Sequence, residues 1–350
     1  AIEPVCLPLK DGRAWMLIRT QVGRLWESFS SDGISWTSPR PSRFISSDSP
    51  AGLARLTDGR IVAIWNCCQR YPYAHGGRQV LHAAISDDDG STWHGFREVV
   101  RDPRRLEPAH PIRGDYGTAY PIATSTSDGK LVFATGQGQS TGVFVLDPEW
   151  LRQTGQSEDF LNGLDNWSVY GTKGFNLVPH PDKFFSKRLL KDALRVERLD
   201  ADFPAGAVWN FPNGRQGTIR VSFQLLPGPA KTSITLTDHF SSPFDAEAEL
   251  NGLFTLQVAE NMPGLGDRPL RAGEWYHLAM AWDVASRTCK VSINNEHWKD
   301  LPQLRLVTEG ANYLRFRSLD DHPVGGGVLI ESISANVELS APGVAPFDLQ

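Results

Sequence analysis

Apolar residues occur in short runs along most of the chain, and glycine, proline and aspartate separate the runs. Early in the chain, pairs of apolar runs flank an Asp-Gly dipeptide, at Asp11-Gly12, Asp58-Gly59 and Asp128-Gly129. Asp-Gly between apolar runs is the strongest short-range signal for a β-hairpin. The pattern therefore predicts hairpins over residues 5–19, 53–65 and 121–135.

Each of the first two hairpins is followed by a further apolar run and then by a turn rich in serine and aspartate. Residues 86–93 read S-D-D-D-G-S-T-W and fit the pattern S-x-D-x-G-x-T-W, and residues 30–36 read S-S-D-G-I-S-W, a shortened copy. In such a turn the carboxylate accepts hydrogen bonds from backbone N–H groups, glycine supplies a left-handed position, and tryptophan packs under the next strand. The third unit lacks this turn and closes with L-D-P-E-W at 146–150. Repetition at this period predicts similar sheets of about four strands.

From about Asn162 to Leu339 the apolar runs become longer and the turn pattern disappears. Residues 273–283 read G-E-W-Y-H-L-A-M-A-W-D, and a second run, C-K-V-S-I-N, follows at 289–294. Side chains two residues apart in a strand share one face, so Leu278, Met280 and Trp282 are expected to face a core. This segment is predicted to be a second all-β domain.

Composition agrees with an all-β protein and excludes several function classes. The chain has 350 residues with 32 Gly, 24 Pro and 11 Trp, which is typical of many turns between strands. The net charge of −5 and the absence of a Lys/Arg run argue against nucleic acid as a partner. No apolar stretch approaches the roughly 20 residues of a membrane span.

Four cysteines are too few for a disulfide scaffold, and they are expected to be ordinary buried thiols. No cofactor or metal site is predicted.

The turns at 30–36 and 86–93 resemble the Asp box of sialidase-like β-propellers, and residues 273–294 resemble the concanavalin-A-like (laminin-G-like) jelly roll. The resemblance implies an all-β chain with the C-terminal half of a six-bladed propeller over 1–155, a jelly roll over 160–340 and a C-terminal tail over 341–350. Three blades alone would leave sheet edges and core exposed. The remaining blades are therefore expected from a second chain, from an N-terminal half upstream, or by symmetry.

The first segment also resembles the exo-sialidases in the order of four residues. The family has a glutamate ahead of an Asp-Gly hairpin, an arginine at the end of the next strand, an arginine ahead of the next Asp box, and a tyrosine ahead of a later Asp-Gly hairpin. Glu3, Arg19, Arg78 and Tyr120 occur in that order. The resemblance implies that Tyr120 is the nucleophile, that Glu3 is its base, and that the two arginines bind the carboxylate of an acidic sugar.

General chemistry agrees with these roles. Planar guanidinium groups bind carboxylates with two hydrogen bonds. A phenol with an ordinary pKa near 10 is a weak nucleophile, and a neighbouring carboxylate can take its proton. His75, Asp115 and Tyr116, in glycine-rich loops, are further candidates for contacts with the substrate. His110 is expected in a similar loop role.

The chain departs from the exo-sialidase pattern at several positions. Ile2 stands where the family has asparagine, Pro121 follows the tyrosine where the family has serine, and Thr135-Gly136 replaces its closing Y-E. The family's first arginine and its general-acid aspartate belong to earlier blades.

The resemblance therefore implies an exo-acting, retaining glycoside hydrolase that releases a terminal acidic sugar, either sialic acid or a uronic-acid-type residue. The protein is expected to be secreted or periplasmic and to meet a glycan substrate. Two alternatives remain open. One is a propeller polysaccharide lyase that acts on a uronic-acid glycan with His75 or His110 as acid or base, and the other is a non-catalytic glycan-binding protein.

Overall fold

The computed structural model describes residues 2–68, 77–107, 117–136, 140–181, 192–243, 248–264, 268–307 and 309–339. The chain is all-β, as predicted, and it divides into two compact units. The second unit comprises residues 154–238 and 246–338, and the first comprises the rest. In the described part of the chain, no helix is long and apolar enough to cross a membrane.

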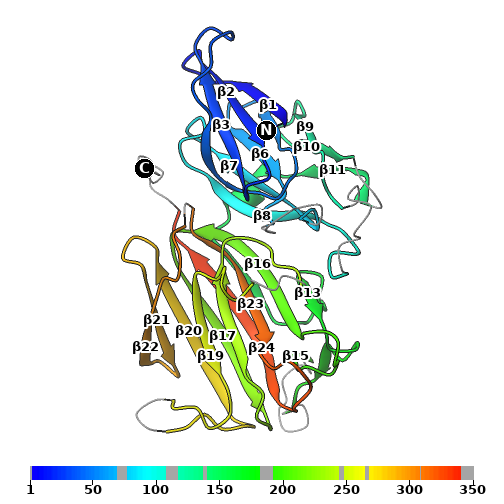
Figure 1. Ribbon diagram of the computed structural model, residues 1–350, viewed down its shortest axis with the longest axis vertical. Coiled ribbons are helices and arrows are strands. Elements are labelled where there is room, and N and C mark those ends of the chain that lie inside the picture. Colours follow the sequence, from blue (N-terminus) through cyan, green and yellow to red (C-terminus); the bar gives the residue numbers. More distant parts are fainter. Residues whose placement is uncertain are drawn as a thin grey trace. The chain divides into compact units, whose positions relative to one another are not determined.

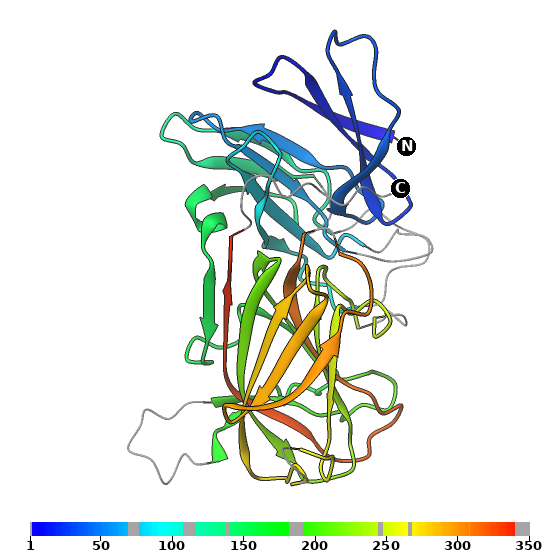
Figure 2. The same cartoon turned by 90° about the vertical axis from the view of Figure 1, so that its left-hand side faces the viewer.

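The first unit contains three antiparallel sheets among its described residues (Figure 1). Figure 2 shows the first sheet in dark blue and the second in lighter blue to cyan as separate sheets. The strands of the first sheet are β1 (Ile2–Pro8), β2 (Ala14–Arg19), β3 (Arg24–Ser30) and β4 (Arg40–Ile45), in that order. Those of the second are β5 (Gly52–Arg55), β6 (Ile61–Trp65), β7 (Val80–Ser86) and β8 (His94–Arg101), also in order. The third has the order β11 (Gly142–Leu146), β10 (Leu131–Thr135), β9 (Ile122–Ser125), and a 3-10 helix, η2 (Pro148–Arg152), follows it.

The three predicted hairpins are the first strand pairs of these sheets. Strand β1 pairs with β2, β5 with β6, and β9 with β10, all antiparallel. The glycines of the Asp-Gly turns, Gly12, Gly59 and Gly129, have φ values of 88°, 88° and 82°. Glycine reaches this left-handed region without a Cβ penalty, so the local sequence determines where the chain reverses.

Both serine-aspartate turns are closed by their aspartate. In the turn at 30–36, Oδ1 of Asp32 accepts hydrogen bonds from the backbone N–H of Ile34 at 2.8 Å and of Ser35 at 2.7 Å. These bonds to the ionised carboxylate lower the pKa of Asp32 to about 2. In the turn at 86–93, Oδ1 of Asp88 accepts from the N–H of Thr92 at 2.7 Å. The carboxylate therefore takes the role that the sequence pattern indicated.

The two turns differ in their tryptophans. Trp93 is buried and lies in the core between the first two sheets, and its indole N–H donates to the carbonyl of Gly90 at 3.0 Å. Trp36, which closes the shortened turn, is only half-buried. The expectation that the tryptophan packs in the core is confirmed for Trp93, which is the more deeply buried of the two.

Aromatic side chains fill the core between the first and second sheets. Phe44 of β4 lies at the centre, with its ring centroid 4.8 Å from that of Trp65 and 5.1 Å from that of Trp93, both edge-on. Edge-to-face packing of this kind adds to the free energy gained from burial. A second apolar cluster joins the other face of the second sheet to one face of the third and includes Leu151 of η2. Each sheet is thus fixed by its neighbour in the chain.

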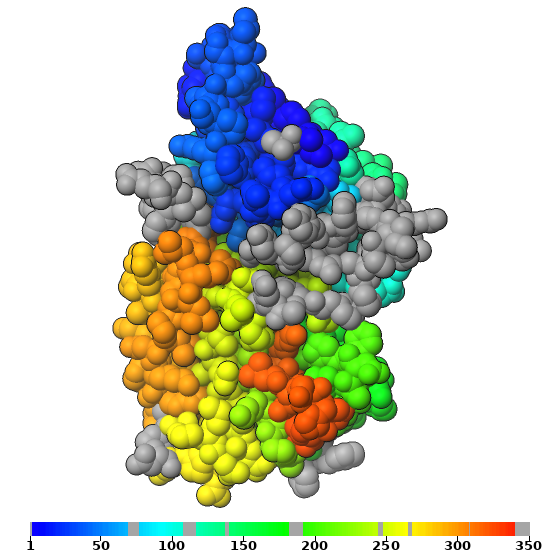
Figure 3. Space-filling view, viewed as in Figure 1, coloured from blue at the N-terminus to red at the C-terminus, as the bar shows by residue number. Residues whose placement is uncertain are grey.

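The second unit is a β-sandwich of two antiparallel sheets. The larger sheet has the order β14 (Leu177–Pro179), β15 (Asp192–Val196), β24 (Gly327–Val337), β17 (Gln216–Leu226), β20 (Trp275–Asp283), β21 (Thr288–Ile293), β22 (Glu296–Pro302), and β12 (Gly155–Glu158) pairs with β24. The smaller sheet has the order β13 (Trp167–Tyr170), β16 (Gly206–Gly214), β23 (Ala311–Ser318), β18 (Thr232–Thr237), β19 (Phe254–Val258). Figure 3 shows β21 and β22, in orange, on the surface of this unit.

One large apolar cluster lies between these two sheets and contains side chains from both. Leu278, Met280 and Trp282 all belong to it and are at most 2 % exposed, as the alternation in β20 predicted. Because alternate side chains of β17, β20 and β24 point into this core, the residues between them form the opposite face of the larger sheet.

The cysteines depart in part from expectation. All four are free thiols, and Cys67, Cys68 and Cys289 are buried, but Cys6 on β1 is exposed. Burial raises the pKa of the Cys68 thiol to about 12. Burial likewise raises the pKa of the Cys289 thiol to about 12, so both groups are protonated at neutral pH and serve as packing groups.

Buried His82 on β7 should make the stability of the first unit depend on pH. Burial of the ring lowers its pKa to about 4 from the ordinary value of 6.5, and its Nδ1 accepts a hydrogen bond from the N–H of Cys67 at 3.1 Å. Between pH 6.5 and 4 the unfolded chain binds the proton that the folded chain excludes, so stability falls as the pH falls through this window. We expect His82 to contribute a loss of about 3 kcal/mol in the free energy of unfolding between pH 7 and pH 4.

Urea unfolding of the wild type and of His82→Gln at both pH values measures this contribution. The wild type should lose more stability than the variant on acidification. Equal losses in the two proteins would contradict the role of His82.

Candidate active site

Four of the predicted site residues lie together in the first unit, at the ends of strands from all three sheets. Glu3 lies on β1, Arg19 ends β2, Arg78 precedes β7 and Tyr120 precedes β9. The cluster therefore combines positions up to 117 residues apart in the chain. The order of sheets, rather than local sequence, brings these side chains together.

A bulge at the start of β1 lets Glu3 reach this cluster. Ile2 pairs with Arg19, but the register shifts between Ile2 and Val5, and Glu3 has a φ of 49°. Tyr120 also has a left-handed backbone, with a φ of 60°. Left-handed conformations are uncommon for residues other than glycine, asparagine and aspartate, and such strain is concentrated at functional sites. Both members of the predicted nucleophile–base pair are held in this way.

Glu3, Arg19 and Tyr120 form a closed triangle of hydrogen bonds. The Tyr120 hydroxyl donates to Oε1 of Glu3 at 3.1 Å. Nη1 of Arg19 donates to Oε2 of Glu3 at 2.5 Å and to the Tyr120 hydroxyl oxygen at 3.3 Å. The carboxylate can accept the phenol proton, and the guanidinium can stabilise the phenolate that this transfer leaves.

Arg78 contacts the ring of Tyr120, whereas Glu3 and Arg19 contact its hydroxyl group. Its guanidinium carbon is 5.4 Å from the centroid of the Tyr120 ring, within the range of a cation–π contact. Its Nη2 donates to the backbone carbonyl of Asp48 at 3.0 Å. Both arginines are buried, with 7 % of Arg19 and 4 % of Arg78 exposed, whereas Glu3 is exposed and Tyr120 is half-buried. Glu3 and Tyr120 are thus accessible to solvent, whereas the guanidinium groups of the two arginines are buried.

Asp48 is a site residue that the sequence did not reveal. Its Oδ1 accepts from Nε of Arg19 at 2.6 Å, its Oδ2 accepts from Nε2 of Gln21 at 3.0 Å, and the residue is 3 % exposed. Burial alone would raise the pKa of this carboxyl, but the hydrogen bonds from Arg19 and Gln21, with the charges of Arg19 and Arg78, lower it. The pKa of Arg19 is raised, because its bonds to Asp48 and Glu3 outweigh the opposing effect of burial. Asp48 therefore orients Arg19 towards Glu3 and Tyr120.

Two glycines allow the segments of the site to approach one another closely. A Cβ on Gly77 would lie 2.2 Å from Cβ of Ser47, and one on Gly117, which has a φ of 106°, would lie 2.3 Å from the carbonyl oxygen of Arg78. The backbone N–H of Thr118 donates to that same carbonyl at 2.9 Å. Glycine is needed at both places because any side chain would push apart the segments that carry Asp48, Arg78 and Tyr120.

The remaining predicted residues lie outside the described part of the chain. These are His75, Asp115 and Tyr116, and also His110. Within the described ranges, no group of three or more His, Cys, Asp or Glu side chains is arranged to hold a metal ion.

One protein-family model matches the first segment of the chain. Residues 1–133 match the family described as BNR repeat-like domain. A search of curated proteins finds no match.

Solved structures that resemble the chain include a protein titled "Sialidase", at 18% identity and a TM-score of 0.35, covering 97% of this chain and 32% of that one. Trypanosoma rangeli sialidase matches at 14% identity and a TM-score of 0.33, covering 97% of this chain and 60% of that one. A structure titled "Apo Crh5 transglycosylase" matches at 13% identity and a TM-score of 0.35, covering 54% of this chain and 86% of that one. The chain therefore spans less than two thirds of the length of either sialidase.

Proposed function

We propose that the protein is an exo-acting, retaining glycoside hydrolase of the sialidase-like superfamily that releases a terminal acidic sugar, since residues 1–133 match a BNR repeat-like domain. The observation that carries the proposal is the hydrogen bond between the Tyr120 hydroxyl and Glu3, with Arg19 bonded to both residues. Tyr120 is the nucleophile, Glu3 its base, and Arg19 and Arg78 bind the sugar carboxylate.

In the first step Tyr120 gives its hydroxyl proton to Glu3. The phenolate oxygen bonds to the anomeric carbon while the bond from that carbon to the leaving oxygen breaks, and a general acid outside these four residues protonates the leaving oxygen. In the second step a water oxygen bonds to the anomeric carbon and the tyrosyl bond breaks. Glu3 returns its proton to Tyr120, and the proton of the water restores the general acid. Two displacements at one carbon retain its configuration.

The charges of the site limit how it can bind an acidic sugar. Arg19 and Arg78 stand beside two carboxylates, those of Glu3 and Asp48, so an incoming carboxylate adds a negative charge to a balanced cluster. We therefore propose that other blades supply a further cation, which binds the sugar carboxylate, and also the general acid.

We also propose that the protein is secreted or periplasmic, because the terminal acidic sugars of glycans occur outside the cytoplasm.

An apolar face on the third sheet supports the proposal that further blades complete the ring. Ile122 is 76 % exposed, Val143 73 % and Val145 68 %, and the half-buried Val132 and Ala134 lie between them in register. The opposite face of this sheet packs on the second sheet, as the second packs on the first. A further blade packed in the same way would cover the exposed face of the third sheet, and a large exposed apolar patch usually marks an interface.

The experiment that tests the proposed function is identification of the residue that becomes bonded to the sugar during turnover.

A further inference from the structure

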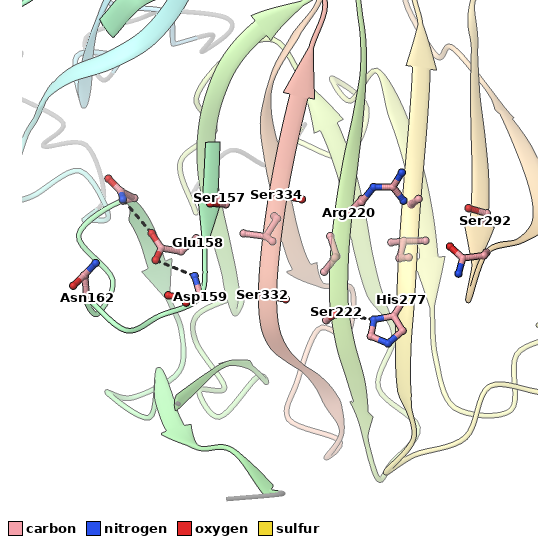
Figure 4. A pocket seen from close by; sticks show the side chains of 16 residues that line it. Ser157, Glu158, Asp159, Asn162, Arg220, Ser222, His277, Ser292, Ser332 and Ser334 are labelled. Atoms are coloured by element: carbon pink, nitrogen blue, oxygen red, sulfur yellow. Dashed lines mark hydrogen bonds between the residues drawn. The ribbon is translucent and has the colours of Figure 1, made fainter. Parts of the chain in front are cut away.

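The larger sheet of the second unit has a groove on its solvent-facing side. The groove has a volume of about 600 Å³ and is lined by residues of β12, β24, β17, β20 and β21, by the segment that follows β12 and by Asn295 after β21 (Figure 4). Ligand pockets in proteins usually have volumes of about 300–1,000 Å³. Among the described residues, all those that line the groove belong to the second unit.

Strand register arranges the groove floor in two rows across the sheet. In one row Arg220 pairs with Ser334 on one side and with Ala279 on the other, and these continue to Ser157 and Ser292. In the second row Ser222 pairs with Ser332 and with His277. The solvent-facing side of a sheet is commonly covered by long polar side chains, but here serines and an alanine surround Arg220 and His277. The groove forms because these small side chains leave space above the sheet.

The floor presents hydrogen-bonding groups rather than an apolar surface. Val221, Leu278 and Ile333, the apolar residues of these strands beside the groove, are at most 2 % exposed because they face the core. Serine hydroxyls both donate and accept hydrogen bonds, and Oγ of Ser222 is already 2.8 Å from Nδ1 of His277. This chemistry matches the hydroxyl groups of a sugar and not an apolar ligand.

Arg220 adds a positive charge to the middle of the floor. Its side chain is exposed, and its guanidinium makes no hydrogen bond or ion pair with the residues that the structure describes. Two carboxylates lie at the rim, and both accept hydrogen bonds from the rim itself. Glu158 accepts from the backbone N–H of Asp159 at 3.2 Å, from that of Phe160 at 3.3 Å and from Nδ2 of Asn166 at 3.1 Å, and Asp159 accepts from the N–H of Leu161 at 3.2 Å. Figure 4 shows Arg220 and His277 on the same face as Ser332 and Ser334. A guanidinium in this position can bind a carboxylate or sulfate through two hydrogen bonds.

We propose that this groove is a binding site for an acidic oligosaccharide, in which Arg220 binds the acidic group and the serines and His277 bind the hydroxyls. The site would hold a glycan chain without acting on it. The inference does not depend on the reaction proposed for Tyr120, since the groove belongs entirely to the second unit.

The test is binding of fluorescently labelled oligosaccharides to the full-length protein, measured by fluorescence polarisation. The probes are a hyaluronan hexasaccharide, sialyllactose and, as a neutral reference, lactose. At least one acidic probe should bind more tightly than lactose. Arg220→Ala should weaken that binding by tenfold or more, and Ala279→Trp should abolish it by filling the groove. Both positions face solvent, so the two variants should fold.

A control variant makes the result specific. Lys290→Ala removes a cation from the same face of the sheet outside the groove lining. This variant should leave groove binding unchanged. The inference is overturned if neither acidic probe binds, if Arg220→Ala and Ala279→Trp bind like the wild type, or if Lys290→Ala weakens binding as much as Arg220→Ala does. The reaction of Tyr120 is tested separately, by turnover, and loss of binding in Arg220→Ala alone concerns the groove and not Tyr120.

Discussion

Replacing Tyr120 with phenylalanine is expected to reduce turnover of a fluorogenic sialoside or uronide by about 10³-fold or more in the full-length protein. The change removes the attacking oxygen and leaves the ring, so the contact with Arg78 persists. The lost hydrogen bonds involve a half-buried hydroxyl, and the free energy of unfolding should change by only about 1 kcal/mol. Steady-state kinetics beside urea unfolding separates the two effects.

Tyr276→Phe is the matched control for this substitution. Its hydroxyl accepts a hydrogen bond from the N–H of Arg271 at 2.7 Å, and it lies in the second unit, so the same chemical change is made away from the site. Turnover should remain at the wild-type level in Tyr276→Phe. Undiminished turnover in Tyr120→Phe would exclude a tyrosine nucleophile at this position.

Replacing Asp48 with alanine is expected to lower the free energy of unfolding by about 3 kcal/mol. Asp48 is buried with Arg19, and removal of one partner leaves the guanidinium charge without its closest counter-ion. The same variant should lose turnover, because Arg19 is no longer held towards Glu3 and Tyr120. Asp48→Asn, which keeps the shape of the side chain, should lose less stability than Asp48→Ala.

The contribution of the Asp48 carboxylate to the free energy of unfolding should decrease at low pH. Its pKa in the folded protein is lowered, so its contribution is complete above the unfolded pKa near 3.9 and is lost as the pH falls towards the folded value. The difference in the free energy of unfolding between the wild type and Asp48→Asn should therefore become smaller below about pH 4. Asp11→Asn, which alters an exposed ion pair with Arg13, serves as the control and should change stability little. A loss in Asp11→Asn as large as that in Asp48→Asn would contradict the account of a buried ion pair.

The parts of the fold that the sequence predicted are those specified locally. An Asp-Gly pair between apolar runs determines a hairpin by itself, and the hairpins begin all three sheets of the first unit. The fourth strand of the first sheet, β4, has no clear local signal, because its residues, R-P-S-R-F-I, lack regular alternation and contain a proline. Strand β16 has the sequence G-A-V-W-N-F-P-N-G, which ends in turn-forming residues, and its pairing shifts between Asn210 and Gly214, so its extent depends on tertiary pairing.

The site shows the same division between local and tertiary information. The order of motifs nominated Glu3, Arg19, Arg78 and Tyr120 because each precedes or follows a recognisable hairpin. Asp48 stands in S-S-D-S-P, which is typical of an ordinary turn, and nothing in those residues indicates that the segment is buried beneath Arg19. Its role depends on the close approach of segments allowed by Gly77 and Gly117, and pairing of this kind is set by tertiary packing.

The central claim, that Tyr120 bonds to the anomeric carbon, is tested most directly by trapping the intermediate with a fluorinated acidic sugar whose second displacement is slow. Mass spectrometry of the full-length protein after digestion would locate the added sugar. The account predicts one adduct per chain, on the peptide and side chain of Tyr120, and no adduct in Tyr120→Phe. An adduct on a carboxylate such as Glu3, or turnover of the substrate with inversion at the anomeric carbon, would contradict it.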